Sequence, residues 1–298
     1  MTQLSFLLAL QDARTPVLTA LMAAATYLAS EEFYLLAVPL VFWVGHRRWG
    51  FRLLIAVMIS FWLNGVLKDL CHTQRPWMAH GDLIEPLLKA TGGGFSFPSG
   101  HSQSAVAMWF FLAWRGGRVW HWAAATLAVA LVGLSRMYLG LHWPVDVAGG
   151  FALGALLLAL CGLVWWAGDE HGVRIGPGWG VVTVLAGPAL MLILAQFTQQ
   201  AFEIAGFLWG AGLGYVATGQ RVQPGAEPPR PIRLRYAAVG VAGCIVVYSA
   251  FKLLWPSGIP AHTLRSLLLG LWITGAVPFL VQRATDRPRG PRVGEASP

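Results

Sequence analysis

Charged residues are scarce in this chain. Only 11% of its 298 residues are Asp, Glu, Lys or Arg, whereas 56% are hydrophobic, and the mean hydropathy is +0.59. A soluble domain carries about a quarter charged residues. The composition therefore excludes an ordinary soluble protein and predicts one that crosses a membrane. The basic residues form short clusters between apolar runs, which is typical of membrane-protein loops and not of a nucleic-acid-binding surface.

Cysteine is scarce as well. The three cysteines lie far apart, in or beside apolar stretches, at Cys71, Cys161 and Cys244. They do not have the spacing of metal ligands, and we expect them to be small buried hydrophobic side chains. Carboxylates do not cluster either, so the sequence offers no ligand set for a divalent cation. We expect neither a metal nor an organic cofactor.

The apolar runs predict ten membrane spans. Six lie before residue 169, at roughly 15–29, 33–45, 52–69, 99–114, 120–135 and 145–167. Four follow, near 179–196, 201–218, 236–255 and 263–281. The first two runs are short, and only Ser30-Glu31-Glu32 separates them. We therefore predict an all-α protein, a polytopic transmembrane helical bundle with six core helices and about four extra C-terminal spans.

Three regions follow from this division. Residues 1–167 form the six-span core, residues 168–282 form a four-span extension, and residues 283–298 form a basic, Pro-rich tail that we expect to be disordered in the cytoplasm. In the extension, glycines recur every four residues at Gly206, Gly210 and Gly214. This spacing predicts close helix packing without any ligand.

The distribution of Lys and Arg predicts the orientation. With both termini in the cytoplasm, fifteen of the 21 basic residues lie on the inner side of a ten-span protein. The positive-inside rule favours this arrangement, in a bacterial-type plasma membrane. Six basic residues remain at the outer ends of the spans: Lys68, Arg75, Lys89, Arg136, Lys252 and Arg265. Charges kept there against the rule are expected to be functional.

A glycine-rich loop, residues 91–94, leads to an apolar helix at Pro98-Ser99-Gly100-His101. Ser99 is a suitable N-cap. The free N–H groups of the first turn and the helix dipole favour an anion at this position. Gly100 lets a ligand approach the backbone, and His101 can carry a proton near neutral pH. The segment indicates a phosphate site with an acid beside it.

Two other polar clusters are expected on the same outer face. One, Lys68 to Pro76, ends the third span, and the other, Ser135 to Asp146, connects the fifth span to the sixth. With residues 98–101 they supply three permanent cations, a helix N-terminus, two histidines and a carboxylate. Phosphoryl transfer needs such groups, because cations and N–H donors bind the phosphate oxygens while other residues serve as nucleophile and acid.

The three clusters read Lys-x6-Arg-Pro, Pro-Ser-Gly-His and Ser-Arg-x5-His-x3-Asp. This pattern resembles the tripartite signature of the type 2 phosphatidic acid phosphatase family, which includes membrane lipid phosphatases and is related to the vanadium haloperoxidases. The resemblance covers the first six spans, and it implies the six-helix core of that family. It implies nothing about the last four spans.

The resemblance also implies a role for each matched position. His142 would be the nucleophile that forms a phosphohistidine, and Asp146 would orient its imidazole. His101 would protonate the leaving lipid oxygen and later activate water. The phosphate would be bound by three cations and three hydrogen-bonding residues: Lys68, Arg75, Arg136, Ser99, Gly100 and Ser135. Because these cations supply the electrostatic stabilisation, no metal is expected.

We therefore expect an enzyme that hydrolyses a lipid phosphate or diphosphate at the outer leaflet. A polyprenyl diphosphate such as undecaprenyl diphosphate is the first choice, because the outer loops are short and Trp-rich spans suit a long isoprenoid. Phosphatidate, phosphatidylglycerophosphate and a sphingoid-base phosphate are alternatives. The Glu31-Glu32-Phe33-Tyr34 elbow is loosely similar to the sphingoid-phosphate branch of the family, and its carboxylates could pair with the cations of the site.

Two other classes of function stay open. A lipid phosphotransferase would use the same phosphohistidine and differ only in its acceptor. A non-enzymatic transporter of an anion or a lipid would instead place its charges near the middle of the spans. The charges in this sequence lie at span ends, and a transporter leaves His142 and Asp146 unexplained.

Overall fold

The computed structural model describes residues 2–170, 177–195, 198–219, 229–255 and 257–285. Within these residues the regular structure is helical and contains no strand, which confirms the predicted all-α class. Five of the described helices are long and apolar enough to cross a membrane, or six crossings result if one bent helix pair counts as a span. The chain is an integral membrane protein, but by length and composition its described helices do not reach the predicted ten spans.

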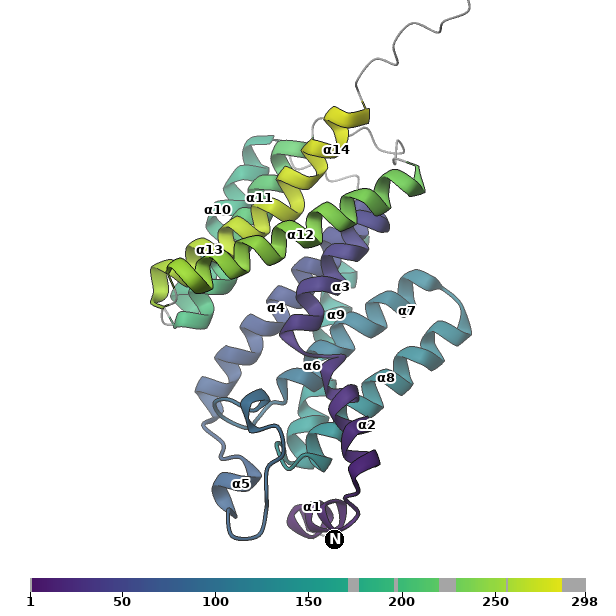
Figure 1. Ribbon diagram of the computed structural model, residues 1–298, viewed down its shortest axis with the longest axis vertical. Helices are drawn as coiled ribbons and strands as arrows, with labels where there is room; N and C mark the ends of the chain where they lie inside the picture. Colours follow the sequence, from purple (N-terminus) through teal and green to yellow (C-terminus); the bar gives the residue numbers. More distant parts are fainter. Residues whose placement is uncertain (1, 171–176, 196–197, 220–228, 256, 286–298) are drawn as a thin grey trace, which may run out of the picture.

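The bent pair explains part of this difference. Helix α1 (Gln3–Asp12) is followed by α2 (Pro16–Tyr27) and α3 (Glu31–Val44). Between α2 and α3 the axis bends by 50°, and the chain continues in the same general direction (Figure 1). The break is too short to reverse the chain, and Ser30 caps α3 at once by accepting a hydrogen bond from the Phe33 N–H. The two antiparallel spans predicted here are one bent crossing.

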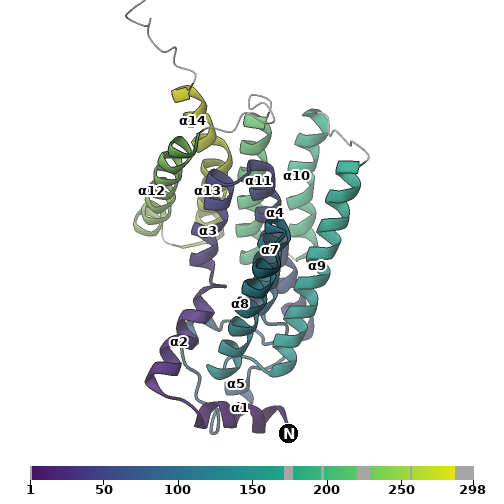
Figure 2. The same ribbon diagram turned by 90° about the vertical axis from the view of Figure 1, so that its right-hand side faces the viewer.

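Because the first two apolar runs make one crossing, α1 lies at the opposite end of the bundle from the one predicted. Helix α1 lies at one end, and α14 (Val277–Thr285) lies at the opposite end (Figures 1 and 2). We predicted that both termini lie on one side of the membrane. The helices nearest to them, α1 and α14, lie at opposite ends of the bundle, so the prediction is wrong for these helices. Arg14, which donates to the carbonyls of Glu85 and Tyr138, moves with α1. Fourteen of the 21 basic residues still belong to the other side by sequence, so the positive-inside rule favours an outward-facing α1.

The core continues with α4 (Arg47–Cys71), which is followed by the short α5 (Pro76–Ala79) and η1 (Lys89–Thr91). A central helix follows as three consecutive segments, α6 (Gly100–Ala105), the π-helical η2 (Val106–Phe110) and α7 (Phe111–Gly116). Helices α8 (Val119–Tyr138) and α9 (Pro144–Glu170) complete the core. All six apolar runs predicted for the core are helical, although the first two make one crossing.

Glycines on α9 allow the central helix to approach it closely. A Cβ at Gly150 would lie 2.6 Å from the carbonyl oxygen of Ser99, and a Cβ at Gly154 would lie 2.5 Å from that of Gln103. Only glycine fits at these two positions, so the start of α6 is held against the start of α9. Both helices begin at the end of the bundle where α1 lies (Figures 1 and 2).

The extension consists of α10 (Pro177–Leu194), α11 (Gln199–Gly219), α12 (Arg230–Leu254) and α13 (Ile259–Leu271), which continues through η3 (Trp272–Ala276) into α14. Gly206, Gly210 and Gly214 of α11 face α13 and its continuation, where a Cβ would lie 2.5, 1.9 and 2.5 Å from the nearest atoms. This confirms the prediction of close helix packing. The boundary between core and extension stays a prediction, and the expected tail lies outside the described residues after Thr285.

Labelling in intact cells tests the corrected topology. In a variant without native cysteines, Ala13→Cys and Ala79→Cys should both react with a membrane-impermeant maleimide added from outside, and Gly117→Cys should not, because α1 and α5 share one end of the bundle. All three positions are exposed. Labelling at Ala79 alone would restore the two-span hairpin, and labelling at Gly117 alone would place the site in the cytoplasm.

Candidate active site

Three segments far apart in the sequence meet at the end of the bundle where α1 lies. They are the last turn of α4 with the loop after it, the first turn of α6, and the connection from α8 to α9. The backbone N–H of Ser99 donates to the carbonyl oxygen of Asp146 at 3.0 Å, which joins two of the predicted motifs directly. Arg75 contacts His142 and joins the third. The structure thus brings the predicted constellation together.

The centre of the site is a buried His–Asp pair. His142 and Asp146 are each 1% exposed, and the His142 Nδ1 lies 3.4 Å from the Asp146 Oδ2. The same carboxylate oxygen accepts hydrogen bonds from the Trp143 N–H at 2.8 Å and from the Ser96 hydroxyl at 2.5 Å. Since the carboxylate favours a proton on Nδ1, the lone pair of the imidazole is left on Nε2.

The surroundings of His142 keep its imidazole neutral. Burial lowers the pKa of His142 well below its usual range, and the positive charges of Arg75 and Arg136 lower it further. A neutral imidazole near pH 7 retains the Nε2 lone pair that a nucleophile requires. The electrostatics and the hydrogen bonds of the site therefore point to the same protonation state.

The Arg75 guanidinium faces the lone pair of the His142 Nε2. Its Nη1 is 3.1 Å from the His142 Nε2, and the side chain is 1% exposed. The guanidinium also donates to four backbone carbonyls, at Gly93, Gly94, Phe95 and Leu141, over 2.6 to 3.3 Å. Its donors are therefore engaged in this state, and a phosphate entering the site has to take the place of some of these contacts.

Arg136 has other hydrogen-bond partners than Arg75, and one of its donors has no partner among the described residues. It is fully buried, and its Nη1 donates to the Thr26 and Thr91 hydroxyls at 2.7 and 3.1 Å. Its Nη2 donates to the Thr91 carbonyl at 2.8 Å. The Arg136 Nε is buried and has no hydrogen-bond partner among the described residues. A buried donor without a partner is costly, and an anion in the site would satisfy it.

Lys68 and His101 complete the set of predicted charged and proton-carrying groups. Both are half-buried, and neither side chain makes a hydrogen bond to another described residue. His101 lies within electrostatic range of Lys68, Arg75 and Arg136. Two of the predicted phosphate-site groups are thus available to a ligand without breaking an internal contact.

The start of α6 is tightly constrained. Ser99 caps the helix, and its hydroxyl oxygen accepts from the Ser102 hydroxyl at 2.9 Å. A Cβ at Gly100 would lie 2.8 Å from the Asn64 Oδ1, so a larger residue there would displace the Asn64 amide. The Asn64 amide donates to the Pro98 carbonyl at 3.1 Å. Ser135 is less favourably placed than predicted, because its hydroxyl proton is used by the Val132 carbonyl at 2.6 Å.

Four residues that support these groups were not among the predicted site residues: Thr26, Asn64, Thr91 and Ser96. Asn64 could have been found, because it is the only asparagine and lies four residues before Lys68 on the same helix face. The other three are ordinary hydroxyl residues in unremarkable contexts. Among the described residues, no group of three or more His, Cys, Asp or Glu side chains could hold a metal ion.

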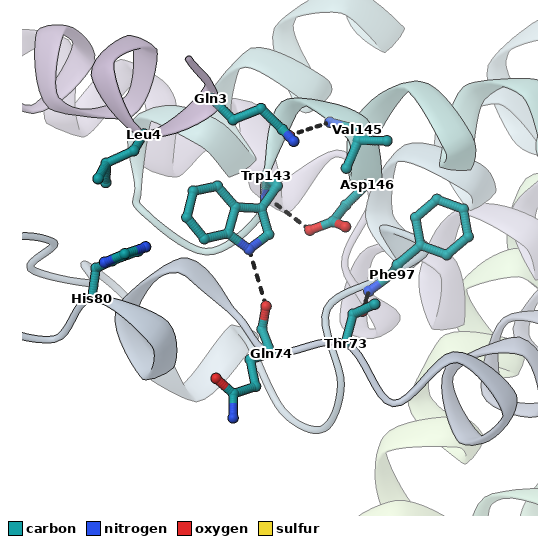
Figure 3. Close-up of a pocket in the computed structure, with 9 residues that line it drawn as sticks. All are labelled: Gln3, Leu4, Thr73, Gln74, His80, Phe97, Trp143, Val145 and Asp146. Carbon is teal, nitrogen blue, oxygen red and sulfur yellow. Dashed lines mark hydrogen bonds between the residues drawn. The ribbon is translucent and has the colours of Figure 1, made fainter.

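A cavity of about 580 Å³ adjoins the site at this end of the bundle (Figure 3). It is lined by Gln3, Leu4, Thr73, Gln74, His80, Phe97, Trp143, Val145 and Asp146. Trp143 stands in its middle, with its indole N–H donating to the Gln74 carbonyl at 3.0 Å. The cavity therefore reaches the site from the side of Asp146, whereas His101 and Lys68 do not line it.

A bundle of apolar helices with a buried His–Asp pair, three cations and a helix N-terminus at one end has the fold and site of a membrane phosphatase. Comparison with known proteins agrees. Residues 49–169 match the family model described as "PAP2 superfamily", and residues 202–287 match "PAP2 superfamily phosphatase, transmembrane extension". The chain belongs to the PAP2 superfamily, which confirms the resemblance read from the three motifs.

Several characterised relatives are phosphatases with different named lipids. The chain is 34% identical over 164 residues to phosphatidylglycerophosphatase B of Bacillus subtilis, covering 49% of this chain and 75% of that protein. It is 33% identical over 113 residues to an undecaprenyl-diphosphatase of Sulfolobus acidocaldarius, covering 37% and 52%. It is 31% identical over 144 residues to sphingosine-1-phosphate phosphatase 2 of Homo sapiens, covering 46% and 35%. The chain thus covers about half the length of the undecaprenyl-diphosphatase and about a third of the length of the sphingosine-1-phosphate phosphatase.

A solved structure is also similar. It is the crystal structure of the first transmembrane PAP2 type phosphatidylglycerolphosphate phosphatase from Bacillus subtilis, which is 28% identical with a TM-score of 0.47. The alignment covers 58% of this chain and 86% of that one. The family match and the curated relatives make this protein a hydrolase of the phosphatase class, and the relatives' names do not agree on one lipid.

Removing the Ser96 hydroxyl tests its support of Asp146. Ser96→Ala should lower kcat roughly 10–100-fold with little change in KM, because a hydrogen bond to a charged group is lost behind the nucleophile. Ser96→Thr, which keeps the hydroxyl, should recover much of the rate. Ser266→Ala, another buried serine that lies in α13, is the matched control and should retain wild-type kinetics. Equal losses in Ser96→Ala and Ser96→Thr would show that the position matters only for packing.

Proposed function

We propose that this protein hydrolyses a phosphate or diphosphate carried by a membrane lipid, through a phosphohistidine on His142 and at the outer face of the membrane. The buried His142–Asp146 pair is the observation that supports this most strongly, since it leaves the Nε2 lone pair directed at the cationic side of the site. The positive-inside rule supports the outward orientation.

The first step forms the covalent intermediate. The His142 Nε2 attacks phosphorus, the bond from phosphorus to the lipid oxygen breaks, and His101 donates a proton to that oxygen. Lys68, Arg75 and Arg136 stabilise the charge on the phosphate oxygens, together with the Ser99 hydroxyl and the backbone N–H of Gly100 at the start of α6. Arg75 leaves the Nε2 lone pair as the phosphate arrives and binds the phosphate instead.

The second step returns the enzyme to its starting state. Water attacks the phosphohistidine while His101 accepts its proton, the nitrogen–phosphorus bond breaks, and inorganic phosphate leaves. His142 is again neutral, with its Nδ1 proton held by Asp146. These residues need no metal to balance the reaction, because two arginines and a lysine carry the positive charge.

A lipid panel tests this function. Purified protein in detergent, with EDTA present, should release phosphate from at least one of undecaprenyl diphosphate, phosphatidate, phosphatidylglycerophosphate and sphingosine 1-phosphate. Undecaprenyl diphosphate is the first candidate, for the reasons drawn from the sequence. Orthovanadate, which mimics the pentacoordinate phosphate, should inhibit. Activity that disappears in EDTA and returns with a divalent cation would contradict the assignment of the cations.

The two histidines should separate kinetically. His142→Ala removes the nucleophile, so turnover and the acid-labile phosphate trapped by rapid quenching should both vanish. His101→Ala removes the acid for the leaving group, which contributes about 10²–10⁴-fold. That loss should be much smaller with p-nitrophenyl phosphate, whose leaving group needs no proton. Trapped phosphate that persists in His142→Ala and is absent in His101→Ala would exchange the two roles.

A further inference from the structure

Helix α1 lies across the end of the bundle at which the active site is found, and the proposed reaction uses none of its residues (Figure 2). Terminal segments are poorly ordered unless contacts tie them down. Three side chains in and directly after α1 bind backbone groups of other segments: those of Gln3, Gln11 and Arg14. Two of these contacts are made at the two ends of the segment that carries His142.

Arg14 holds the chain before His142. Its Nη2 donates to the Tyr138 carbonyl oxygen at 3.0 Å and to the Glu85 carbonyl oxygen at 2.9 Å, and its Nε donates to the Tyr138 carbonyl oxygen at 3.3 Å. Tyr138 is the last residue of α8, where a carbonyl has no acceptor role within the helix and the helix dipole favours a cation. Arg14 thus caps the end of α8 four residues before His142.

Gln3 holds the chain after His142. The Gln3 Oε1 accepts a hydrogen bond from the Val145 N–H at 3.1 Å (Figure 3). Val145 lies in the first turn of α9, where backbone N–H groups have no partner within the helix. The two ends of α1 therefore bind the end of α8 and the start of α9, and the nucleophile lies between these two points.

The loop at residues 83–85 joins α1 to the same connection. The Gln11 side-chain amide donates to the Leu83 carbonyl and accepts from the Glu85 N–H, at 2.9 Å in both cases. Gly140, with φ +70°, packs on this loop, and a Cβ there would lie 3.2 Å from the Glu85 carbonyl oxygen. Helix α1, the loop and the connection from α8 to α9 are thus bound to one another.

His142 has only long contacts of its own within the connection. Its backbone N–H donates to the Arg136 carbonyl at 3.3 Å, and its Nδ1 is 3.4 Å from the Asp146 Oδ2. Both distances exceed the usual range for an N–H donor and an oxygen acceptor. The position of the imidazole therefore depends on how the ends of its segment are held, and a misplacement of about 1 Å at a reacting group can cost about 10²-fold in rate.

We propose that α1 positions His142 for its attack on phosphorus, with Arg14 and Gln3 as the positioning residues. This inference rests on the proposed function, in which His142 is the nucleophile. Neither positioning residue touches a reacting atom, and the effect of each passes through the backbone of residues 138–145.

Kinetics of the lipid that the wild-type protein hydrolyses test this role. Arg14→Ala should lower kcat about 10–100-fold with little change in KM, because the cations that bind the phosphate stay in place. Arg14→Lys keeps the charge and a donor and should recover part of the rate. Gln3→Ala, at an exposed position, should also lower kcat. Arg233→Ala is the matched control and should keep wild-type kinetics, because Arg233 donates to the Val44 and Gly45 carbonyls at the end of α3.

The binding of two anions is a second readout, which needs no turnover. Orthovanadate becomes five-coordinate by bonding to a nucleophile, whereas inorganic phosphate binds through cations and N–H donors alone. Calorimetric titration of the wild-type protein should show tighter binding of orthovanadate, and this preference should disappear in His142→Ala. Arg14→Ala should reduce the preference by the same factor as kcat, since a transition-state analogue reports the same geometry. Arg233→Ala should leave the preference unchanged.

The outcomes separate this inference from a structural role and from the proposed function. Equal losses of kcat in Arg14→Ala and Arg233→Ala, equal weakening of both anions, or a wild-type protein without a preference for orthovanadate would overturn the inference. If Arg14→Ala does not fold, wild-type kcat in Gln3→Ala overturns it. Phosphate release that neither positioning variant changes would overturn the inference and keep the proposed function. An orthovanadate preference that depends on Arg14 and His142, without phosphate release from any lipid, would do the opposite.

Discussion

The burial of two guanidinium groups is the constraint on which the site depends. Arg75 and Arg136 are 1% and 0% exposed inside a bundle of apolar helices, where an unsatisfied charge would be very costly. Backbone carbonyls of the glycine loop satisfy Arg75, and threonines on α2 and η1 satisfy most of Arg136. The loop before α6 is therefore shaped by Arg75, and the bent α2 is needed where it is because Thr26 contacts Arg136.

The proposed nucleophile, His142, likewise depends on one residue with several contacts. Asp146 serves as acceptor for a histidine, a backbone N–H and a serine, and its own carbonyl accepts from the Ser99 N–H at the start of α6. The glycines of α9 make this approach possible. The start of α9 thus holds His142 in place and also fixes the start of α6 opposite it. This explains why the motif on α6 and the motif at α9 have to meet closely.

Much of the site could be predicted from the sequence, because its charged residues stand out in a chain with so few charges. Lys68, Arg75 and Arg136 stand out by their place at span ends, and His101, His142 and Asp146 by the motifs that resemble the family signature. Supporting residues such as Ser96 and Thr91 could not be found, because a buried hydroxyl has no signal until its partner is located in space. The all-α class also followed from the lengths of the apolar runs.

The course of the first crossing could not be predicted, for a different reason. Two apolar runs separated by three polar residues fit a hairpin and a bend equally well, since hydropathy records burial in the membrane and not chain direction. What distinguishes them is tertiary: Thr26 must reach Arg136, and Tyr34 must reach Ser104, which requires α2 and α3 to follow one another along the core. The positive-inside count is insensitive to the choice, because only Arg14 changes sides.

The site has different surroundings on its Asp146 side and on its Lys68 and His101 side. On the Asp146 side lies the cavity lined by α1 and the loops around Gln74 and Trp143, at the very end of the bundle. On the Lys68 and His101 side lie α3, α4 and the first turn of α11. In the proposed function a lipid would arrive between these helices, whereas water would enter and phosphate would leave at the end of the bundle. The bend between α2 and α3 makes this separation possible, because it carries α1 to the cavity and leaves α3 on the other side.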